Sequence, residues 1–188
     1  TMDRRLARWL PRMWRLGFVD HEAIARSTKE RSRCSISSSP TARFRANIFY
    51  QRGSVSLAFR NIFTSVPTIE SLGLPTVLAS ICQRPQGLAL VCGPTGSGKS
   101  STLAAMLQSI NESRTAHVVT IEDPIEYLFR DAKSFITQRE VGVDTIGYEV
   151  ALKNAMRQDP DIILIGEMRS VDTMQTVLSA AETGHQVF

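Results

Sequence analysis

The sequence is poor in cysteine, with three among its 188 residues, at positions 34, 82 and 92, and no CxxC pair. An odd number of cysteines at this spacing favours neither a disulfide framework nor a zinc site, which leaves a reducing, cytosolic compartment as the default. The sequence also has no uncharged apolar run approaching the ~20 residues that a membrane-spanning helix needs. Hydrophobic residues at 43% and charged residues at 21% are instead typical of a globular protein.

The net charge of +4 conceals an uneven distribution along the chain. Residues 1–60 contain thirteen Lys/Arg and four Asp/Glu, a balance of +9, whereas residues 61–188 contain nine and fourteen, a balance of −5. Because the basic charge lies outside the part that has catalytic motifs, it is a weak argument for nucleic-acid binding.

The sequence predicts three regions, 1–40, 41–75 and 76–188. In the first, arginines interleave with Leu and Trp in the pattern of a basic amphipathic helix, interrupted at Pro11, and residues 35–40 predict a flexible linker. This region could be a membrane-surface helix or a targeting peptide, but we favour a disordered or non-native end.

The second region predicts a β-hairpin and the third an α/β fold. Apolar and polar residues alternate over 44–50, which predicts a strand, and Arg52 and Gly53 mark a turn. Residues 55–63 predict a second strand. A linker with a capped turn is expected over 66–75. After a short helix over 78–82, the predicted strands are 88–92, 118–121 and 162–165, and the predicted helices are 100–110, 148–158 and 170–182. This alternation predicts a parallel sheet with helices on both faces. The apolar end at Val187 and Phe188 indicates the start of another strand, and so a fragment.

Residues 93–100 satisfy the pattern G-x-x-x-x-G-K-[ST], between an apolar strand and an amphipathic helix. Glycines at these positions allow backbone N–H groups to surround phosphates, and the helix N-terminus adds partial positive charge. We expect Lys99 to neutralise the β- and γ-phosphates of ATP and the Ser100 hydroxyl to help hold Mg²⁺. The residues predicted to bind the nucleotide are Gly93, Pro94, Thr95, Gly96, Ser97, Gly98, Lys99, Ser100 and Ser101.

Acidic residues follow two of the predicted strands. Glu122 and Asp123 come after 118–121, with Glu126 close behind, and Glu167 comes after 162–165. In a doubly wound sheet, ligands bind at the carboxyl ends of the strands. We therefore predict ATP hydrolysis with Mg²⁺ held through Ser100, Asp123 and Glu126, and with Glu167 orienting or deprotonating the attacking water. The second strand resembles a Walker B segment, although glycine stands before Glu167 in place of the usual aspartate.

Several motifs together resemble the type IV pilus retraction (PilT-type) ATPases of the type II/IV secretion, GspE-like, superfamily. The motifs that carry the resemblance are 43–49, 51–53, the phosphate loop, 120–127, 138–142, 164–169 and 181–185. The resemblance covers about residues 43–188 and implies a RecA-like P-loop NTPase core, preceded here by part of a small α+β N-terminal domain.

The resemblance also implies roles for single residues and for partners. In that family a hexameric ring hydrolyses ATP at the boundaries between subunits. Arg45 and Arg60 match the family's arginine fingers, which reach the phosphates of a nucleotide bound by the neighbouring subunit. Glu122 matches the family's acidic box together with Asp123 and Glu126, Glu167 its catalytic glutamate, and His185 the first residue of its histidine box. The residues predicted to be catalytic are therefore Glu167, Glu122, Arg45, Arg60 and His185. The implied partners are the ring itself and the pilus or secretion machinery at the cytoplasmic face of the inner membrane, which drives twitching motility.

Residues 1–40 do not resemble the family, and the chain stops before the second histidine and the C-terminal helical domain. Three alternatives to retraction therefore stay open: a pilus-assembly or type II secretion ATPase, a ring helicase and an inactive nucleotide-binding fragment. A ring helicase needs aromatic stacking platforms or a basic channel. The 7% aromatic content and the acidic core argue against both. No nucleic-acid partner is therefore expected.

Overall fold

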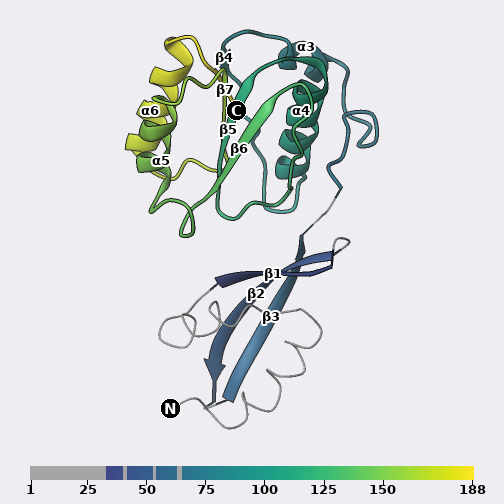
Figure 1. Cartoon of the computed structure of the whole chain (residues 1–188), viewed down its shortest axis with the longest axis vertical. Coiled ribbons are helices and arrows are strands. Elements are labelled where there is room, and N and C mark those ends of the chain that lie inside the picture. The colour runs from purple at the N-terminus through teal and green to yellow at the C-terminus, as the bar shows by residue number, and fades with distance from the viewer. Residues whose placement is uncertain (1–32, 40–41, 53, 63–64) are drawn as a thin grey trace. The chain divides into compact units, whose positions relative to one another are not determined.

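The computed structural model describes residues 33–39, 42–52, 54–62 and 65–188. The chain divides into two compact units, Thr1–Thr64 and Ser65–Phe188 (Figure 1). The amphipathic helix predicted near the N-terminus lies outside the described residues. No helix in the described part of the chain is long and apolar enough to span a membrane.

The described part of the first unit is a three-stranded antiparallel sheet. Strands β1 (Arg33–Ser39), β2 (Ala42–Gln51) and β3 (Ser54–Ile62) follow one another in the order β1-β2-β3. The predicted hairpin is confirmed, with Arg52 at φ 50 in the left-handed conformation that tight hairpin turns require.

The predicted flexible linker is wrong for residues 35–39, because these residues form most of β1 and pair with β2. Cys34 lies opposite Ala46 and Ile36 opposite Phe44, while serines occupy the positions between. An alternation of this kind suits a sheet with one apolar face, even where serine is the commonest residue.

The second unit contains a parallel sheet of five strands in the order β4-β8-β7-β5-β6. The strands are β4 (Gly87–Leu88), β5 (His117–Glu122), β6 (Phe135–Glu140), β7 (Ile162–Ile165) and β8 (Gln186–Val187). The helices are α3 (Val77–Cys82), α4 (Lys99–Ser113), α5 (Tyr148–Ala155) and α6 (Val171–Glu182). The predicted parallel α/β fold is confirmed; β4 is shorter than expected, and β6 was not predicted.

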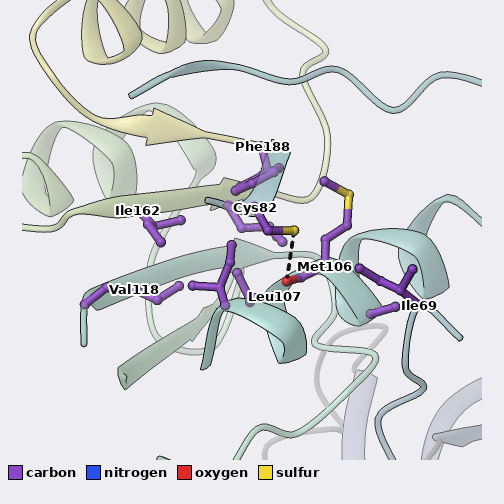
Figure 2. Close-up of a cluster of buried hydrophobic side chains, with 11 residues drawn as sticks. Ile69, Cys82, Met106, Leu107, Val118, Ile162 and Phe188 are labelled. Carbon is purple, nitrogen blue, oxygen red and sulfur yellow. Dashed lines mark hydrogen bonds between the residues drawn. The ribbon is translucent and has the colours of Figure 1, made fainter. Parts of the chain in front are cut away.

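Helices cover both faces of this sheet, α3 and α4 on one side and α5 and α6 on the other (Figure 1). Alternate strand residues point to opposite faces, so Val118 and Ile162 join one cluster while Val119 and Ile163 join the other. The first cluster, with Cys82, Met106, Leu107 and Phe188, is drawn in Figure 2. Two apolar layers therefore hold the strand ends in place.

The segment before α3 packs with the second unit. Ile69 is only 5% exposed and belongs to the same buried cluster as Leu107. Thr68 and Ser71 cap each other: the backbone N–H of Thr68 donates to Ser71 Oγ (2.9 Å) and that of Ser71 to Thr68 Oγ1 (3.1 Å). The capped turn expected from the sequence is present, and the structure groups residues 65–75 with the sheet that follows.

Candidate functional site

The loop between β4 and α4 contains backbone conformations that favour glycine. Gly96 has φ 81 and Gly98 φ 92, both in the left-handed region that side-chain-bearing residues rarely adopt. At Gly93 an added Cβ would lie 2.6 Å from Ser97 Oγ, the end of a side chain that can rotate away. The glycines at positions 96 and 98 thus follow from the shape of the loop itself.

Helix α4 begins directly at this loop with its first N–H groups available. Gly98 is the N-cap and has no side chain to accept a hydrogen bond, and the Thr102 N–H makes the first intrahelical bond to Gly98 O (2.8 Å). A helix N-terminus without a side-chain cap presents N–H donors and a partial positive charge to an anion. This geometry suits a phosphate.

The ammonium of Lys99 points back onto the loop. Its Nζ donates to the carbonyl oxygens of Gly93 (2.9 Å) and Pro94 (3.0 Å). Both acceptors are neutral, and an ammonium has three donors. The positive charge of Lys99 therefore lies on the loop with no carboxylate partner among these contacts, which is the arrangement that attracts an anionic ligand.

Glu122, the last residue of β5, accepts hydrogen bonds from one side chain on its own strand and from one on the adjacent strand β6. Thr120 Oγ1 donates to Glu122 Oε1 at 2.8 Å, and Gln138 Nε2 from β6 donates to the same oxygen at 3.3 Å. Desolvation by burial raises the pKa of Glu122, opposed by these two hydrogen bonds and by the backbone N–H of Glu126. The carboxyl is thus fixed in place and shifted toward the protonated form.

The loop after β5 connects the acidic strand end to helix α4. Tyr127, buried at 7% exposure, lies with its Oη 2.9 Å from Ser101 Oγ in the first turn of α4. The N–H of Ile125 donates to Glu140 Oε2 on β6 (3.2 Å). Asp123 and Glu126 are exposed on this loop, and the Asp123–Pro124 bond is cis.

Glu167 follows β7 at the same edge of the sheet. The N–H of Gly166 donates to Ile121 O (2.8 Å), which continues the β5–β7 pairing beyond Ile165. The Glu167 side chain is 33% exposed, and its Oε1 lies 2.8 Å from Nε of Arg169, whose side chain is 81% exposed. Such an exposed ion pair contributes little stability, so Glu167 is free to exchange this partner for a ligand.

The structure brings most of the predicted site residues to one edge. The phosphate loop, Glu122 and Glu167 all follow parallel strands of one sheet, so they lie at its carboxyl edge. Burial raises the pKa of the Tyr148 phenol, and the charges of Glu167, Asp123 and Glu122 raise it further. The edge therefore combines an anion-binding loop with carboxylates, as the sequence predicts.

Three predicted residues lie elsewhere. His185 precedes β8, which places it at the amino edge of the sheet, where its Nδ1 is 2.9 Å from Ala180 O. The structure does not bring it to the other site residues within this unit. Arg45 and Arg60 belong to the first unit, where they are direct partners across the β2–β3 hairpin. The finger role of the two arginines stays a prediction.

Nothing in the described residues forms a metal cage of three or more His, Cys, Asp or Glu side chains. Mg²⁺ usually keeps several waters and is held by one or two protein groups plus substrate phosphates. Ser100 in the first turn of α4 and the exposed carboxylates of Asp123 and Glu126 are chemically suited to that partial role.

Comparison with known proteins identifies the family. The family described as "Type II/IV secretion system protein" matches residues 67–188, which is more than half of the chain. The chain belongs to this family. The matched residues run from the segment before α3 to β8, so they include the phosphate loop, Glu122 and Glu167.

Among curated relatives, the type IV pilus retraction ATPase PilT of Pseudomonas aeruginosa is 52% identical over 147 residues, 78% of this chain and 43% of the relative. The type IV pilus ATPase PilU of the same organism is 46% identical over 169 residues, 89% of this chain and 44% of the relative. The chain thus spans less than half the length of these relatives.

Solved structures agree with the fold. The pilus retraction motor PilT with bound ADP matches at a TM-score of 0.86 and 47% identity, covering 91% of this chain and 50% of that chain. The ATPase DotB of Legionella pneumophila matches at a TM-score of 0.76 and 26% identity, with 90% of this chain and 50% of that chain covered. The RecA-like core expected from the resemblance is confirmed.

Several residues of the site received no role in the sequence analysis, although Thr120, Gln138 and Arg169 lie within the motifs quoted there. Thr120 lies two residues before Glu122, on the same face of β5, a period-two relation that could have indicated it. Gln138 could not be found in this way, because its strand was not predicted. Tyr148 and Arg169 reach the acidic edge through space, and no local pattern indicates their roles.

Proposed function

We propose that this chain binds ATP with Mg²⁺ and hydrolyses it as one subunit of a pilus motor. The observation that carries the proposal is the shared sheet edge: the phosphate loop with Lys99 and the uncapped start of α4 lie at the same edge as Glu122 and Glu167. A phosphate loop alone fits binding, whereas a carboxylate beside it supplies a group that can act on water.

Each residue would have a distinct task during hydrolysis. The loop N–H groups and the start of α4 bind the phosphates, and Lys99 exchanges its two carbonyl acceptors for phosphate oxygens. Glu167 leaves Arg169, orients the attacking water and accepts its proton. Ser100, Asp123 and Glu126 would hold Mg²⁺, which when bound neutralises charge on the phosphates. Glu122, half-buried and hydrogen-bonded, keeps the β5 end in place.

We propose that the working form is a hexameric ring in which Arg45 and Arg60 reach a neighbour's nucleotide. Their pairing across β2 and β3 puts both at one register position, so a single movement of the hairpin would carry both. A finger supplied by a neighbour stabilises the charge of the transition state and makes turnover depend on assembly. In this proposal His185 acts in the assembled ring.

The proposed cellular role is pilus retraction in twitching motility, at the cytoplasmic face of the inner membrane. Support comes from the similarity to PilT and from a twitching motility protein of Neisseria gonorrhoeae, 50% identical over 78% of this chain and 39% of the relative. The type II secretion protein E of Xanthomonas campestris is less similar, 41% identical over 57% of this chain and 18% of the relative. The difference favours retraction over secretion.

The test is steady-state MgATP hydrolysis across a protein concentration series. The proposal predicts turnover that rises faster than linearly with protein, because fingers come from neighbouring subunits. Nucleotide binding without any hydrolysis would contradict the enzymatic assignment and favour a binding fragment. Stimulation by single-stranded DNA would contradict the motor assignment and favour a helicase.

A further inference from the structure

The phenol of Tyr148 lies at the acidic edge, and the hydrolysis proposed above gives it no task. Tyr148 is the first residue of α5, and its Oη lies 3.4 Å from the point where a Cβ on Gly166 would be. The same point is 3.4 Å from Glu122 Cα and Ile121 O. The hydroxyl therefore lies over the junction of β5 and β7, next to the residue that precedes Glu167.

The surroundings of this hydroxyl are acidic. Burial raises the pKa of Tyr148, and the nearby charges of Glu167, Asp123 and Glu122 raise it further, with Arg169 acting in the opposite direction. The phenol is therefore neutral at working pH and keeps its proton as a donor. Ionised carboxylates only accept hydrogen bonds, so donor and acceptors face one another here.

No hydrogen bond joins the Tyr148 hydroxyl to another group in the described part of the chain. The phenol lies on the first turn of a helix whose Ala151 and Leu152 are fully buried, so its position is fixed by packing. Arg169, the present partner of Glu167, is 81% exposed and weakly held. Tyr148 is thus the more rigid of the two donors near Glu167.

Resting on the proposed function, we propose that Tyr148 is a positioning residue for Glu167. Its hydroxyl donates a hydrogen bond to the Glu167 carboxylate when phosphates occupy the loop, which holds the carboxylate at the sheet edge and away from Arg169. No proton leaves the phenol, since Glu167 alone receives the proton of the attacking water.

The test is Tyr148→Phe in the full chain, which removes one oxygen and keeps the ring. We expect kcat for ATP hydrolysis to fall about tenfold, the scale of one lost hydrogen bond to a charged group. The KM for ATP, the Kd for ADP and the thermal midpoint are expected to stay unchanged. A structural role alone would move the midpoint, and a binding role would move KM.

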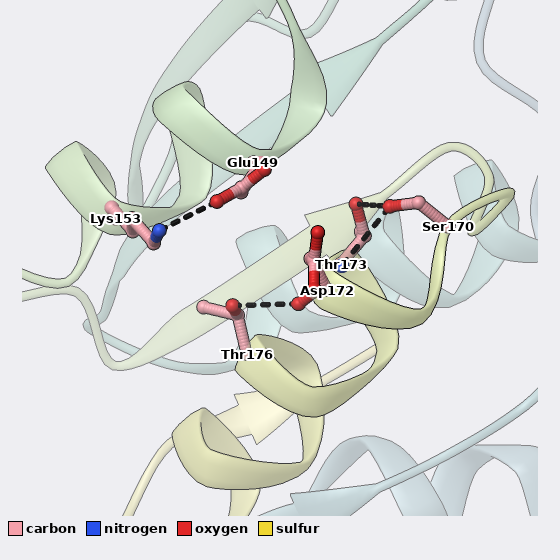
Figure 3. Close-up of polar contacts among 6 residues, drawn as sticks. All are labelled: Glu149, Lys153, Ser170, Asp172, Thr173 and Thr176. Atoms are coloured by element: carbon pink, nitrogen blue, oxygen red, sulfur yellow. Dashed lines mark hydrogen bonds and ion pairs between the residues drawn. The ribbon is translucent and has the colours of Figure 1, made fainter.

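The matched control is Glu149→Gln, on the same turn of α5. The Glu149 side chain is 42% exposed and pairs only with Lys153 among the contacts drawn in Figure 3. This variant should keep the kcat of the unmodified chain. A Tyr148→Phe variant with unchanged kcat, or with KM raised in proportion to the loss, would overturn the proposal while leaving ATP hydrolysis intact.

A second readout does not need turnover. ADP with aluminium fluoride and Mg²⁺ imitates a phosphoryl group in transit, and its affinity reports how well Glu167 is positioned. Tyr148→Phe should weaken this complex about tenfold with ADP affinity unchanged. Equal affinities in the two chains would overturn the role of Tyr148, whereas a failure of the unmodified chain to hydrolyse ATP would overturn only the proposed function.

Discussion

The ammonium of Lys99 lies 2.9 Å from the carbonyl oxygen of Gly93, six residues earlier in the chain, so the loop is closed by its own lysine. A second bond of 3.0 Å to Pro94 O completes this contact. Because carbonyls are weaker acceptors for an ammonium than phosphate oxygens, a nucleotide can replace them at a net gain. The lysine therefore keeps the loop ordered before binding and contributes charge during it.

Replacing Lys99 with alanine tests this double role. The variant loses charge-assisted hydrogen bonds to the phosphates, worth ~1.5–3 kcal/mol, so ADP should bind about 10- to 100-fold more weakly. A titration with a fluorescent ADP analogue measures the effect. Lys133→Ala removes an equal charge from an exposed loop and serves as the control. Equal losses in both variants would mean that net charge alone attracts the nucleotide.

Replacing Glu167 with glutamine separates binding from chemistry. The amide keeps the size of the side chain but cannot accept a proton from water, so hydrolysis should fall about 10²- to 10⁴-fold. ADP affinity should change little, because the phosphate loop is untouched. Glu182→Gln, an exposed residue at the end of α6, is the control. Normal turnover in Glu167→Gln would move the catalytic role to another carboxylate.

The raised pKa of Glu122 predicts a stability that depends on pH. Between the ordinary glutamate pKa of 4.5 and the raised value, the folded chain binds more protons than the unfolded chain. Stability contributed by this group is therefore present at low pH and falls as pH rises through that interval. Glu122→Gln removes the buried charge but keeps an oxygen that can accept from Thr120 and Gln138.

We expect Glu122→Gln to unfold at a higher temperature than the unmodified chain at pH 8, and the difference to shrink as pH approaches 4. Thermal unfolding in EDTA measures this without a contribution from bound metal. Glu70→Gln, on an exposed turn, should leave the midpoint unchanged at both pH values. A difference that stays constant with pH would show that the charge of Glu122 is not the cause.

The sequence was sufficient to predict those parts of the site that depend on local chemistry. The left-handed conformations of Gly96 and Gly98 require glycine, so the motif could be found without a structure. Strands β5 and β7 are buried over almost their whole length and appear as short apolar runs. Acidic residues after such runs must lie at one edge of a parallel sheet.

The parts that could not be predicted depend on pairing through space. Strand β6 contains Thr137, Gln138 and Arg139 and lies at the edge of the sheet, so its residues are neither alternating nor uniformly apolar. Without β6, no pattern places Gln138 beside Glu122. The strand predicted over 88–92 pairs with β8 at Gly87 and Leu88, and the N–H of Ala89 also donates to Val187 O at 2.9 Å.

Gln138 connects three parts of the site, and its loss should be costly. Its amide donates to Tyr127 O (2.9 Å) as well as to Glu122, and its Oε1 accepts from the Phe129 N–H (3.0 Å). Gln138→Leu leaves these partly buried groups without a partner, so we expect about 1–3 kcal/mol of lost stability. Urea unfolding measures the loss, with Gln158→Leu on an exposed position as the control. Equal stabilities would mean that water replaces the amide.

The two described cysteines should differ sharply in reactivity. Cys82 is fully buried in the cluster of Figure 2, with its Sγ 3.5 Å from Met106 O, and burial raises its pKa to about 11. Cys92 is exposed beside the phosphate loop. Since the thiolate is the reactive form, a thiol of pKa 11 has roughly 100-fold less of it at pH 8 than an ordinary thiol of pKa 9.

Iodoacetamide at pH 8 should therefore modify Cys92 in the folded chain and leave Cys82 intact, as read by peptide mass mapping. In urea both cysteines should react at similar rates, because unfolding exposes Cys82 and restores an ordinary pKa. Saturating ADP should slow the modification of Cys92, which is next to the loop that binds phosphates, without changing Cys82. Rapid modification of Cys82 in the folded chain would mean that the buried cluster of Figure 2 opens on the timescale of the reaction.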